Sequence, residues 1–536
     1  MLLGKSRRKR PTRITPIKTH LPLELWIVIA SYVPSEALFK LLGINRQLFN
    51  WIMDRLYEKV DFNLDRITGG IQKPNVEQLR YSSIIRRVKF LRISLGHRYG
   101  PHAWYEGSLK ERVLRKIAHT KHARDIVNVA PSGIDGCLLT HVSTLALCID
   151  SPTFFHPFAP LVTSFWHANS QNLQHLTLQF EMRDLYAILQ PLLEAPISLH
   201  NLSEFTFWAN HDGKDRDLAR FPRDQVDEVT RWLTSLILPA RGSLRNLNLI
   251  LSPNVDTTYL FSELARAPLT QLKRVVFSQA CGADSFPTEQ SFSHFLLAHC
   301  KRSLNHLIIE PYMFCSHRGS NLIKQLESYI NWLTNEFSGL ELPGLRTLQL
   351  GVPGWPEHSK ETLFPRNGEF FLSKHSRSLA SLFILAQPLD LRQLAMLTAA
   401  FVPDHGSLQY LNFGMEDLTP ECLDLLARDL PRLKYLDIQP SFLAIQAPDG
   451  VGVKRLEVFN SASDSLLFTT QMEGRLYTHW ALRRLQINIH YSGDSEYHGA
   501  VQGAFSKSLP PSAIVIIDRH PTLKYFDSDF NLEDLV

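Results

Sequence analysis

The sequence predicts an α/β fold in two parts: an N-terminal module of three short helices, then a solenoid made of a curved parallel sheet with outer helices. Residues 20–62 hold three short stretches with apolar side chains at helical spacing. From residue 140 onward, the pattern apolar-x-x-apolar-x-apolar returns at steps of 20 to 42 residues. A chain of 536 residues and 61.3 kDa is long for one globular core, which favours a repeat architecture.

The N-terminal module is predicted from its apolar spacing. Pro22 suits the first turn of a helix, because its missing N–H has no partner there in any case. Ser35 can cap the second helix. Apolar residues then recur at helical spacing in the three helices: Leu25, Ile29 and Val33; Leu38, Leu41 and Leu42; Leu48, Ile52 and Leu56. Three short helices cannot bury all of this surface among themselves, so part of it is expected to face a partner.

The same segment carries a series of short motifs: Leu21-Pro22-x-Glu24-Leu25, Ile29, Tyr32-Val33, Leu38, Leu41, Ile44-Asn45-Arg46-x-Leu48-Phe49 and Leu56-Tyr57-x-x-Val60-x-Phe62. This series resembles the F-box of fungal F-box proteins. The resemblance implies docking, through an apolar face, on the adaptor of a cullin–RING (SCF-type) ubiquitin ligase. By motif position, the implied adaptor contacts are Leu21, Pro22, Leu25, Ile29, Leu38, Ile44 and Phe49. The family often has Trp or Phe where Leu48 stands, and Phe49 is expected to take that role.

The repeated pattern predicts a short strand in each copy. In the cleanest copy, Leu173-x-x-Leu176-x-Leu178, the second and third apolar residues alternate with polar ones, so one side of the strand is buried. The other copies begin at Val142, Leu202, Leu244, Leu272, Leu304, Leu345, Leu379, Leu408, Leu433, Val453 and Leu482, and Leu523 with Phe526 forms a frayed last copy. Helical patterns lie between them at Met182–Leu193, Gln225–Leu238, Leu322–Phe337 and Leu418–Leu430.

A strand followed by a helix, in units of about 30 residues, resembles the leucine-rich repeat. This resemblance implies that the strands form one curved parallel sheet, because each unit buries its apolar edge only against its neighbours. The regular asparagine of the family, three residues after the last apolar position, is present only as Asn210. A degenerate solenoid is therefore expected, with residues 1–19 as a disordered basic tail, 20–62 as the F-box, 63–139 as a basic connecting region that leads into the solenoid, and 140–536 as the repeats.

The charge is distributed unevenly along the chain. Residues 1–18 carry +7, residues 19–79 carry −1, residues 80–124 carry +10 and residues 125–536 carry −11, which sum to +5. The acidic solenoid argues against a nucleic-acid groove, since phosphate binding needs positive charge along the track. For 80–124, a solvated face that offsets the acidic solenoid is favoured over a binding patch. Lys5–Arg10 has the composition of a nuclear import signal, with a solvated tail as the alternative.

Several features predict an intracellular protein of the nucleus or cytoplasm, without membrane contact. Leu21–Val33 is apolar, but Glu24 interrupts it and no cleavage pattern follows. The chain has no uninterrupted apolar stretch of about 20 residues, the length that a membrane span requires. The six cysteines form no CxxC pair, which favours a reducing compartment.

No catalytic site, metal site or cofactor is predicted. The motifs GxSxG, HExxH and GxGxxG are absent, and His119 and His122 have no further metal ligand at the usual spacing. The expected function is that of a non-catalytic substrate receptor, whose F-box joins the adaptor and cullin and whose solenoid binds a protein target. The alternatives are an F-box scaffold that acts outside any ligase, and an enzyme whose site the sequence does not reveal.

The target is expected to bind the concave face of the solenoid. Side chains alternate across a strand, so the residues on either side of the second apolar position point away from the core. Aromatic and arginine side chains are enriched among energetic hot spots of protein interfaces. The first expected target contacts are therefore Trp208, Tyr410, Tyr435, Arg455 and Phe459.

Overall fold

The structure is a computed structural model of the chain. It describes residues 22–34, 37, 46–63, 79–95, 134–149, 155–181, 185–193, 198–210, 223–251, 255, 257–267, 269–280, 290–299, 303–312, 328–329, 331–333, 335–337, 339–351, 372–402, 407–447, 452–456, 461–489 and 497–519.

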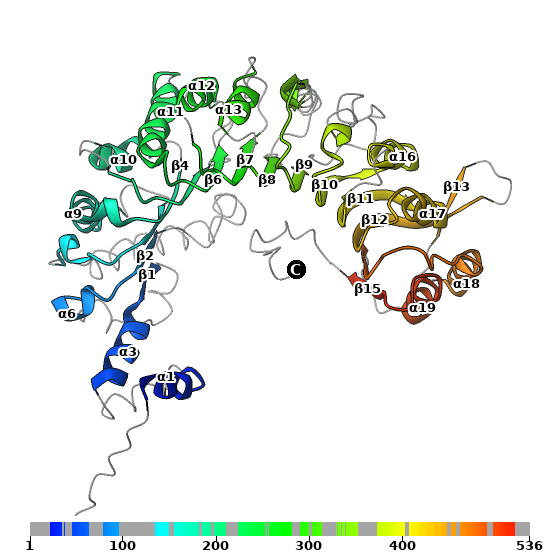
Figure 1. Ribbon diagram of the computed structural model, residues 1–536, viewed down its shortest axis with the longest axis horizontal. Helices are drawn as coiled ribbons and strands as arrows, with labels where there is room; N and C mark the ends of the chain where they lie inside the picture. The colour runs from blue at the N-terminus through cyan, green and yellow to red at the C-terminus, as the bar shows by residue number, and fades with distance from the viewer. Residues whose placement is uncertain are drawn as a thin grey trace, which may run out of the picture.

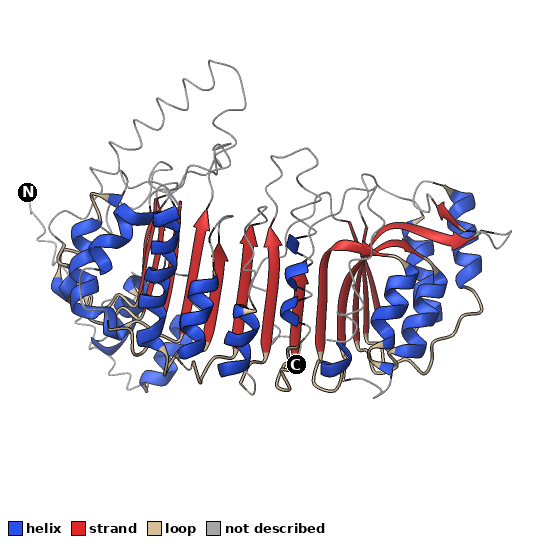
Figure 2. Cartoon of the chain, turned by 90° about the horizontal axis from the view of Figure 1, so that it is seen from above, coloured by secondary structure: helices blue, strands red, loops and turns tan. Residues whose placement is uncertain are grey.

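The described strands form a single sheet that follows the chain in order. The strand order is β1 to β12, then β14 and β15, with every neighbour in this series paired in parallel, and β13 pairs with β12 off this path. The sheet bends into an open arc with helices on its outer side (Figure 1). Figure 2 shows the strands of this parallel series running in the same direction beside one another. The predicted fold class, an α/β solenoid with a curved parallel sheet and outer helices, is confirmed.

The strands are β1 (Lys59–Asn63), β2 (Phe90–Leu95), β3 (Thr144–Ile149), β4 (His175–Glu181), β5 (Glu204–Asn210), β6 (Asn246–Leu251), β7 (Arg274–Ala280), β8 (His306–Tyr312), β9 (Thr347–Gly351), β10 (Ser381–Leu389), β11 (Tyr410–Leu418), β12 (Tyr435–Gln446), β13 (Val453–Leu456), β14 (Arg484–Ile489) and β15 (Ile514–Arg519). The helices are α1 (Leu23–Ser31), α3 (Arg46–Tyr57), α6 (Ser82–Ile85), α9 (Ala159–Asn169), α10 (Leu185–Leu193), α11 (Arg223–Ile237), α12 (Thr258–Arg266), α13 (Ser291–His299), α16 (Leu391–Ala399), α17 (Pro420–Asp429), α18 (Ala462–Met472) and α19 (His498–Ser508), with short 3₁₀ turns that include η3 (Gly136–Leu138).

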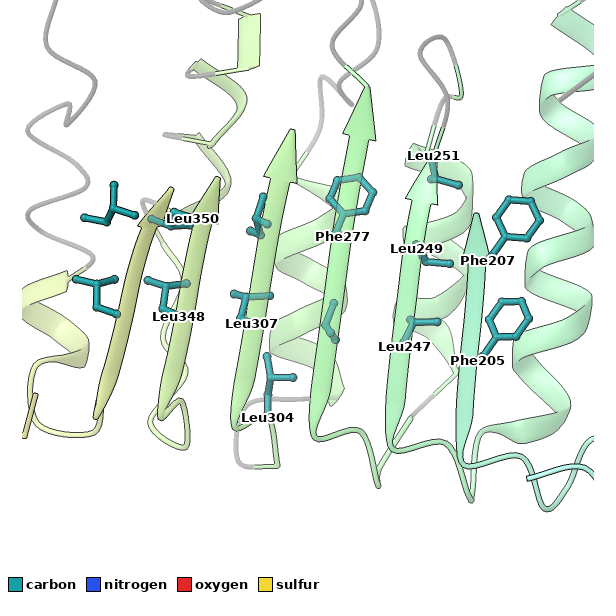
Figure 3. Packing of buried hydrophobic residues seen from close by; sticks show 14 of the residues in the cluster. Phe205, Phe207, Leu247, Leu249, Leu251, Phe277, Leu304, Leu307, Leu348 and Leu350 are labelled. Carbon is teal, nitrogen blue, oxygen red and sulfur yellow. The ribbon is translucent and has the colours of Figure 1, made fainter. Parts of the chain in front are cut away.

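Two rows of apolar side chains run through the repeats between the sheet and the helices. In β6, Leu247 lies level with Phe205 of β5 and Val275 of β7, and two residues further along, Leu249 lies level with Phe207. All of these side chains are buried. Figure 3 shows Phe205, Phe207, Leu247 and Leu249 among them. The register matches the second and third apolar positions of the sequence pattern. Each unit therefore buries its apolar surface against its two neighbours, as a solenoid requires.

The outer helices close this core. Phe261 of α12 and Phe292 of α13 pack edge-on with ring centroids 4.8 Å apart, and Phe292 stacks on Phe277 of β7 at 5.2 Å. Three predicted helices are found with small shifts at their ends, as α10, α11 and α17. The predicted helix at 322–337 lies in part outside the described residues.

The parallel ladder begins before residue 140 and ends after the last clear copy of the pattern. β1 and β2 pair with each other, and β2 pairs with β3. β15 pairs with β14 through Val515 and Ile517, which are the inward residues of this strand. The pattern misses β15 because Ser512 stands where the first apolar residue would be. The frayed copy at Leu523 and Phe526 lies outside the described residues.

The predicted parallel strand at Val453 is wrong. β13 runs antiparallel to the end of β12, with Val453 level with Gln446 and Leu456 level with Leu443. β12 is long enough to extend beyond the ladder, and Gly452 takes a φ of 92° at the turn into β13, a conformation that glycine adopts without strain. The segment therefore forms a hairpin on β12, and the next repeat strand is β14.

Candidate functional site

The first candidate surface is formed by the two N-terminal helices. α1 and α3 pack against each other through a small core of their own, made by Ala30, Leu48 and Ile52. Leu48 is fully buried in this core, whereas its neighbour Phe49 is 38% exposed. Leu48 therefore holds the two helices together, and Phe49 is partly exposed to solvent.

The outer side of α1 carries an exposed apolar stripe. Leu25, Val28, Ile29 and Tyr32 lie at spacings of three and four residues, which places them on one face of the helix. Leu25 is 48% exposed and Ile29 is 46% exposed. Apolar side chains on one face of a short helix, without cover from the rest of the described chain, suit docking against a partner. We call Leu25, Val28, Ile29, Tyr32 and Phe49 the N-terminal apolar face.

Four of the seven implied adaptor contacts lie within the described residues. Pro22, Leu25, Ile29 and Phe49 are all exposed. Leu21, Leu38 and Ile44 lie outside the described residues. Adaptor contact by any of these residues stays a prediction. Val28 and Tyr32 were not among the implied adaptor contacts, although Tyr32 stands in the motif series and the spacing of both residues from Leu25 was the available signal.

Arg87 links the N-terminal module to the start of the solenoid. Arg87, which follows α6, donates hydrogen bonds to the Asn50 backbone oxygen at 3.1 Å and to the Asp54 carboxylate at 2.5 Å. Its second terminal nitrogen donates to the Asn50 side chain at 3.0 Å. A planar guanidinium that makes three bonds to one helix fixes the direction of that helix. The N-terminal apolar face therefore has a defined orientation with respect to the concave face of the sheet.

The concave face is the second candidate surface. Its side chains come from the positions between the buried rows, in the register that the strand pairing sets. Trp208 on β5 is 39% exposed, and Tyr410 and Tyr435 are half-buried, whereas Leu411 and Leu436 beside them are buried. The tyrosines thus stand on the predicted side of their strands. Phe459 lies outside the described residues.

Arg455 does not lie on a repeat strand of the concave face, contrary to the expectation. It belongs to the antiparallel strand β13, where its guanidinium lies 4.5 Å from the centre of the Phe442 ring. It also donates to Asp417 and Glu416, each at 2.7 Å. These contacts tie β13 to the ends of β11 and β12, so the geometry gives Arg455 a role within the hairpin.

The concave face buries two polar residues that the strand register predicted to be accessible. Asn412 is 1% exposed and Asp437 is 6% exposed. Their short side chains lie between larger neighbours and bond laterally: Asn412 Nδ2 donates to Asp437 at 3.3 Å, and Asn488 Nδ2 donates at 2.7 Å. Burial raises the pKa of Asp437 to about 7, Asp518 adds to the rise, and Arg484 opposes it. Burial also raises the pKa of Tyr410 well above its usual range.

Within the described ranges, no group of three or more His, Cys, Asp or Glu side chains could hold a metal ion. None of the helices in the described part of the chain is both long and apolar enough to cross a membrane.

Comparison with known proteins gives likeness only among solved structures. No protein-family model matches the chain, and no curated protein matches it. An internalin from Listeria monocytogenes shares 16% identity over 74% of this chain and 81% of its own, with a TM-score of 0.26. The Rad7 and Elc1 complex in yeast shares 15% identity over 92% of this chain and 97% of that chain, with a TM-score of 0.35. Identities this low are compatible with unrelated functions.

Proposed function

We propose that this chain is a substrate-recognition subunit of a cullin–RING ubiquitin ligase. In this proposal the N-terminal apolar face docks on the adaptor, and the concave face of the solenoid holds a protein target. The observation that carries the proposal is the exposed stripe of α1, which falls on the segment whose motif series resembles the F-box.

The mechanism is positional. Arg87 holds α3 against the start of the solenoid, so a target on the concave face keeps a set position relative to the adaptor. A target held there brings its acceptor lysines close to the ubiquitin-conjugating enzyme, which raises the local concentration of these lysines. The bond-forming chemistry belongs to the partner subunits. An import role for Lys5–Arg10, which lie outside the described residues, stays a prediction.

Adaptor co-precipitation tests the proposal. The double variant Leu25→Asp with Ile29→Asp places two charges on the N-terminal apolar face, where burial against a partner would be costly. We expect adaptor recovery to fall by at least about tenfold, since burial of two apolar side chains is worth several kcal/mol. The matched control is Leu466→Asp, which changes an exposed leucine (68% exposed) on α18.

Three outcomes are informative. Unchanged adaptor recovery by the double variant, with an unchanged melting temperature, would refute the docking surface. Equal losses in the double variant and in Leu466→Asp would also refute it. Recovery of the adaptor without the cullin would contradict the ligase and favour a scaffold that acts outside it.

A further inference from the structure

The concave face near its C-terminal end carries a cluster of aromatic and acidic side chains. The ring of Phe383 on β10 lies 4.8 Å from that of Tyr410 on β11, centre to centre, and Tyr410 lies 6.4 Å from Tyr435 on β12. Asp437 is two residues beyond Tyr435 and lies level with Asn412 and Gln486 in the sheet. Phe383 lies level with Asn412, in the same cross-strand row as the buried Asp437, and the two tyrosines lie level with each other two residues earlier on their strands.

Negative charge exceeds positive charge in this cluster. Asp437 accepts hydrogen bonds from two asparagine amides, and Asp518 of β15 accepts one from Gln486 at 3.0 Å. Arg484 is near enough to affect Asp437 electrostatically, but it donates to the Gln486 side-chain oxygen at 2.5 Å. Among the described residues, Arg484 forms no ion pair. The cluster thus holds two carboxylates, and the guanidinium that acts on Asp437 is hydrogen-bonded to Gln486.

One acceptor in the cluster has no donor. The side-chain oxygen of Asn412 is buried and has no hydrogen-bond partner among the described residues. A buried acceptor without a donor is unfavourable, and native structures rarely leave one unexplained. A group that brings N–H donors and positive charge would satisfy this oxygen and balance the carboxylates at once.

We propose that this cluster binds a lysine or arginine side chain of the target protein. We name it the Asp437 cluster: Phe383, Tyr410, Asn412, Tyr435, Asp437, Asn488 and Asp518. The half-buried tyrosine rings offer their faces to a cation. Because Asp437 and Asn412 are buried, the cation reaches the carboxylate and the asparagine oxygen as these rings turn aside, and it then donates to both. The net charge of −11 over residues 125–536 attracts basic partners toward the solenoid. This inference deepens the proposed function and rests on the concave face being the target surface.

Peptide binding to the full chain tests the inference. The probes are fluorescein-labelled hexa-arginine and hexaglutamate, measured by fluorescence anisotropy near pH 8 and about 150 mM salt. At this pH, above the pKa of about 7, Asp437 is ionised, and this salt concentration screens long-range charge effects. We expect hexa-arginine to bind and hexaglutamate not to bind. Asp437→Asn should weaken hexa-arginine binding by about tenfold, the usual scale of a lost charge-assisted hydrogen bond.

The matched control neutralises a different carboxylate on the same face. Glu204 on β5 bonds His175 at 3.1 Å and lies outside the Asp437 cluster, so Glu204→Gln should bind hexa-arginine as the unaltered chain does. Tyr410→Leu keeps the carboxylate and removes one ring, and should weaken binding about threefold.

Two results would overturn the inference. One is equal affinity of Asp437→Asn and Glu204→Gln for hexa-arginine, because a general charge effect would then explain binding. The other is a preference for hexaglutamate. Adaptor co-precipitation separates this failure from failure of the proposed function, since Asp437→Asn leaves the N-terminal apolar face intact, and Leu25→Asp with Ile29→Asp leaves the Asp437 cluster intact.

Discussion

At the scale of single residues, Asp437 couples stability to pH. Its pKa rises from 3.8 to about 7, chiefly because burial disfavours the charged carboxylate. Between these two values the folded chain binds the proton that the unfolded chain has released. The stabilising contribution of the protonated group is therefore complete below pH 3.8 and is lost as the pH rises through about 7.

Asp437→Asn removes this dependence. The new amide can donate to the Asn412 oxygen that has no partner, and it carries no charge at any pH. We expect the variant to exceed the unaltered chain in unfolding free energy by on the order of 3 kcal/mol near pH 8 and by much less near pH 4. Thermal melts at both pH values measure the difference. A gap that stays constant with pH would contradict the raised pKa.

At the scale of elements, η3 and α9 approach each other too closely for any side chain between them. The Gly136 backbone nitrogen donates to Ser164 Oγ at 2.9 Å, and its oxygen accepts from Asn169 Nδ2 at 3.2 Å. A Cβ at Gly136 would lie only 2.5 Å from the Phe165 nitrogen of α9, a backbone atom that cannot turn aside. The close approach of α9, and not a positive φ angle, therefore explains why residue 136 is a glycine.

Gly136→Ala should therefore destabilise the chain, by about 3 kcal/mol, as overpacked sites do. The matched control is Gly242→Ala, because no atom lies within 4 Å of the added Cβ there. We expect the melting temperature of the control to stay the same or rise slightly, since alanine loses less backbone entropy on folding. Equal melting temperatures for the two variants would show that η3 moves away from α9 freely.

At the scale of the whole molecule, stability is local because each strand meets only its neighbours. β14 pairs with β12 on one side and β15 on the other, and Leu485 is fully buried between them. Leu485→Ala should cost about 2 to 5 kcal/mol. In a solenoid this loss of stability weakens the interfaces between neighbouring repeats, and it does not lower the stability of distant repeats.

Amide hydrogen exchange, measured strand by strand, tests whether the loss of stability stays local. In Leu485→Ala, amides of β12, β14 and β15 should exchange faster, while amides of β3 to β6 should keep their protection. Leu476→Ala, at a residue that is 70% exposed near the same repeat, is the control and should leave all strands unchanged. Equal acceleration in β3 to β6 would mean that the solenoid unfolds as one cooperative body.

The N-terminal apolar face was only partly foreseeable. The spacing of Leu25 and Ile29 places them on one face of a helix whatever the tertiary structure is. Whether Leu48 or Phe49 turns inward depends on how α3 crosses α1, and the packing buries Leu48. Exposure is thus a property of the helix pair, and the helical period by itself does not determine it.

The amino-acid sequence by itself determined the parallel ladder, because its apolar pattern has the period of a strand and each copy can bury its leucines only against the next. Tertiary structure decided the exceptions. Val453 and Leu456 have the spacing of a repeat strand, yet they pair backward on an overlong β12. Asn412 and Asp437 sit at outward positions, yet lateral hydrogen bonds and neighbouring rings bury them. Both outcomes depend on which side chains the neighbouring strands place beside these residues. The apolar pattern of a single strand does not specify its neighbours.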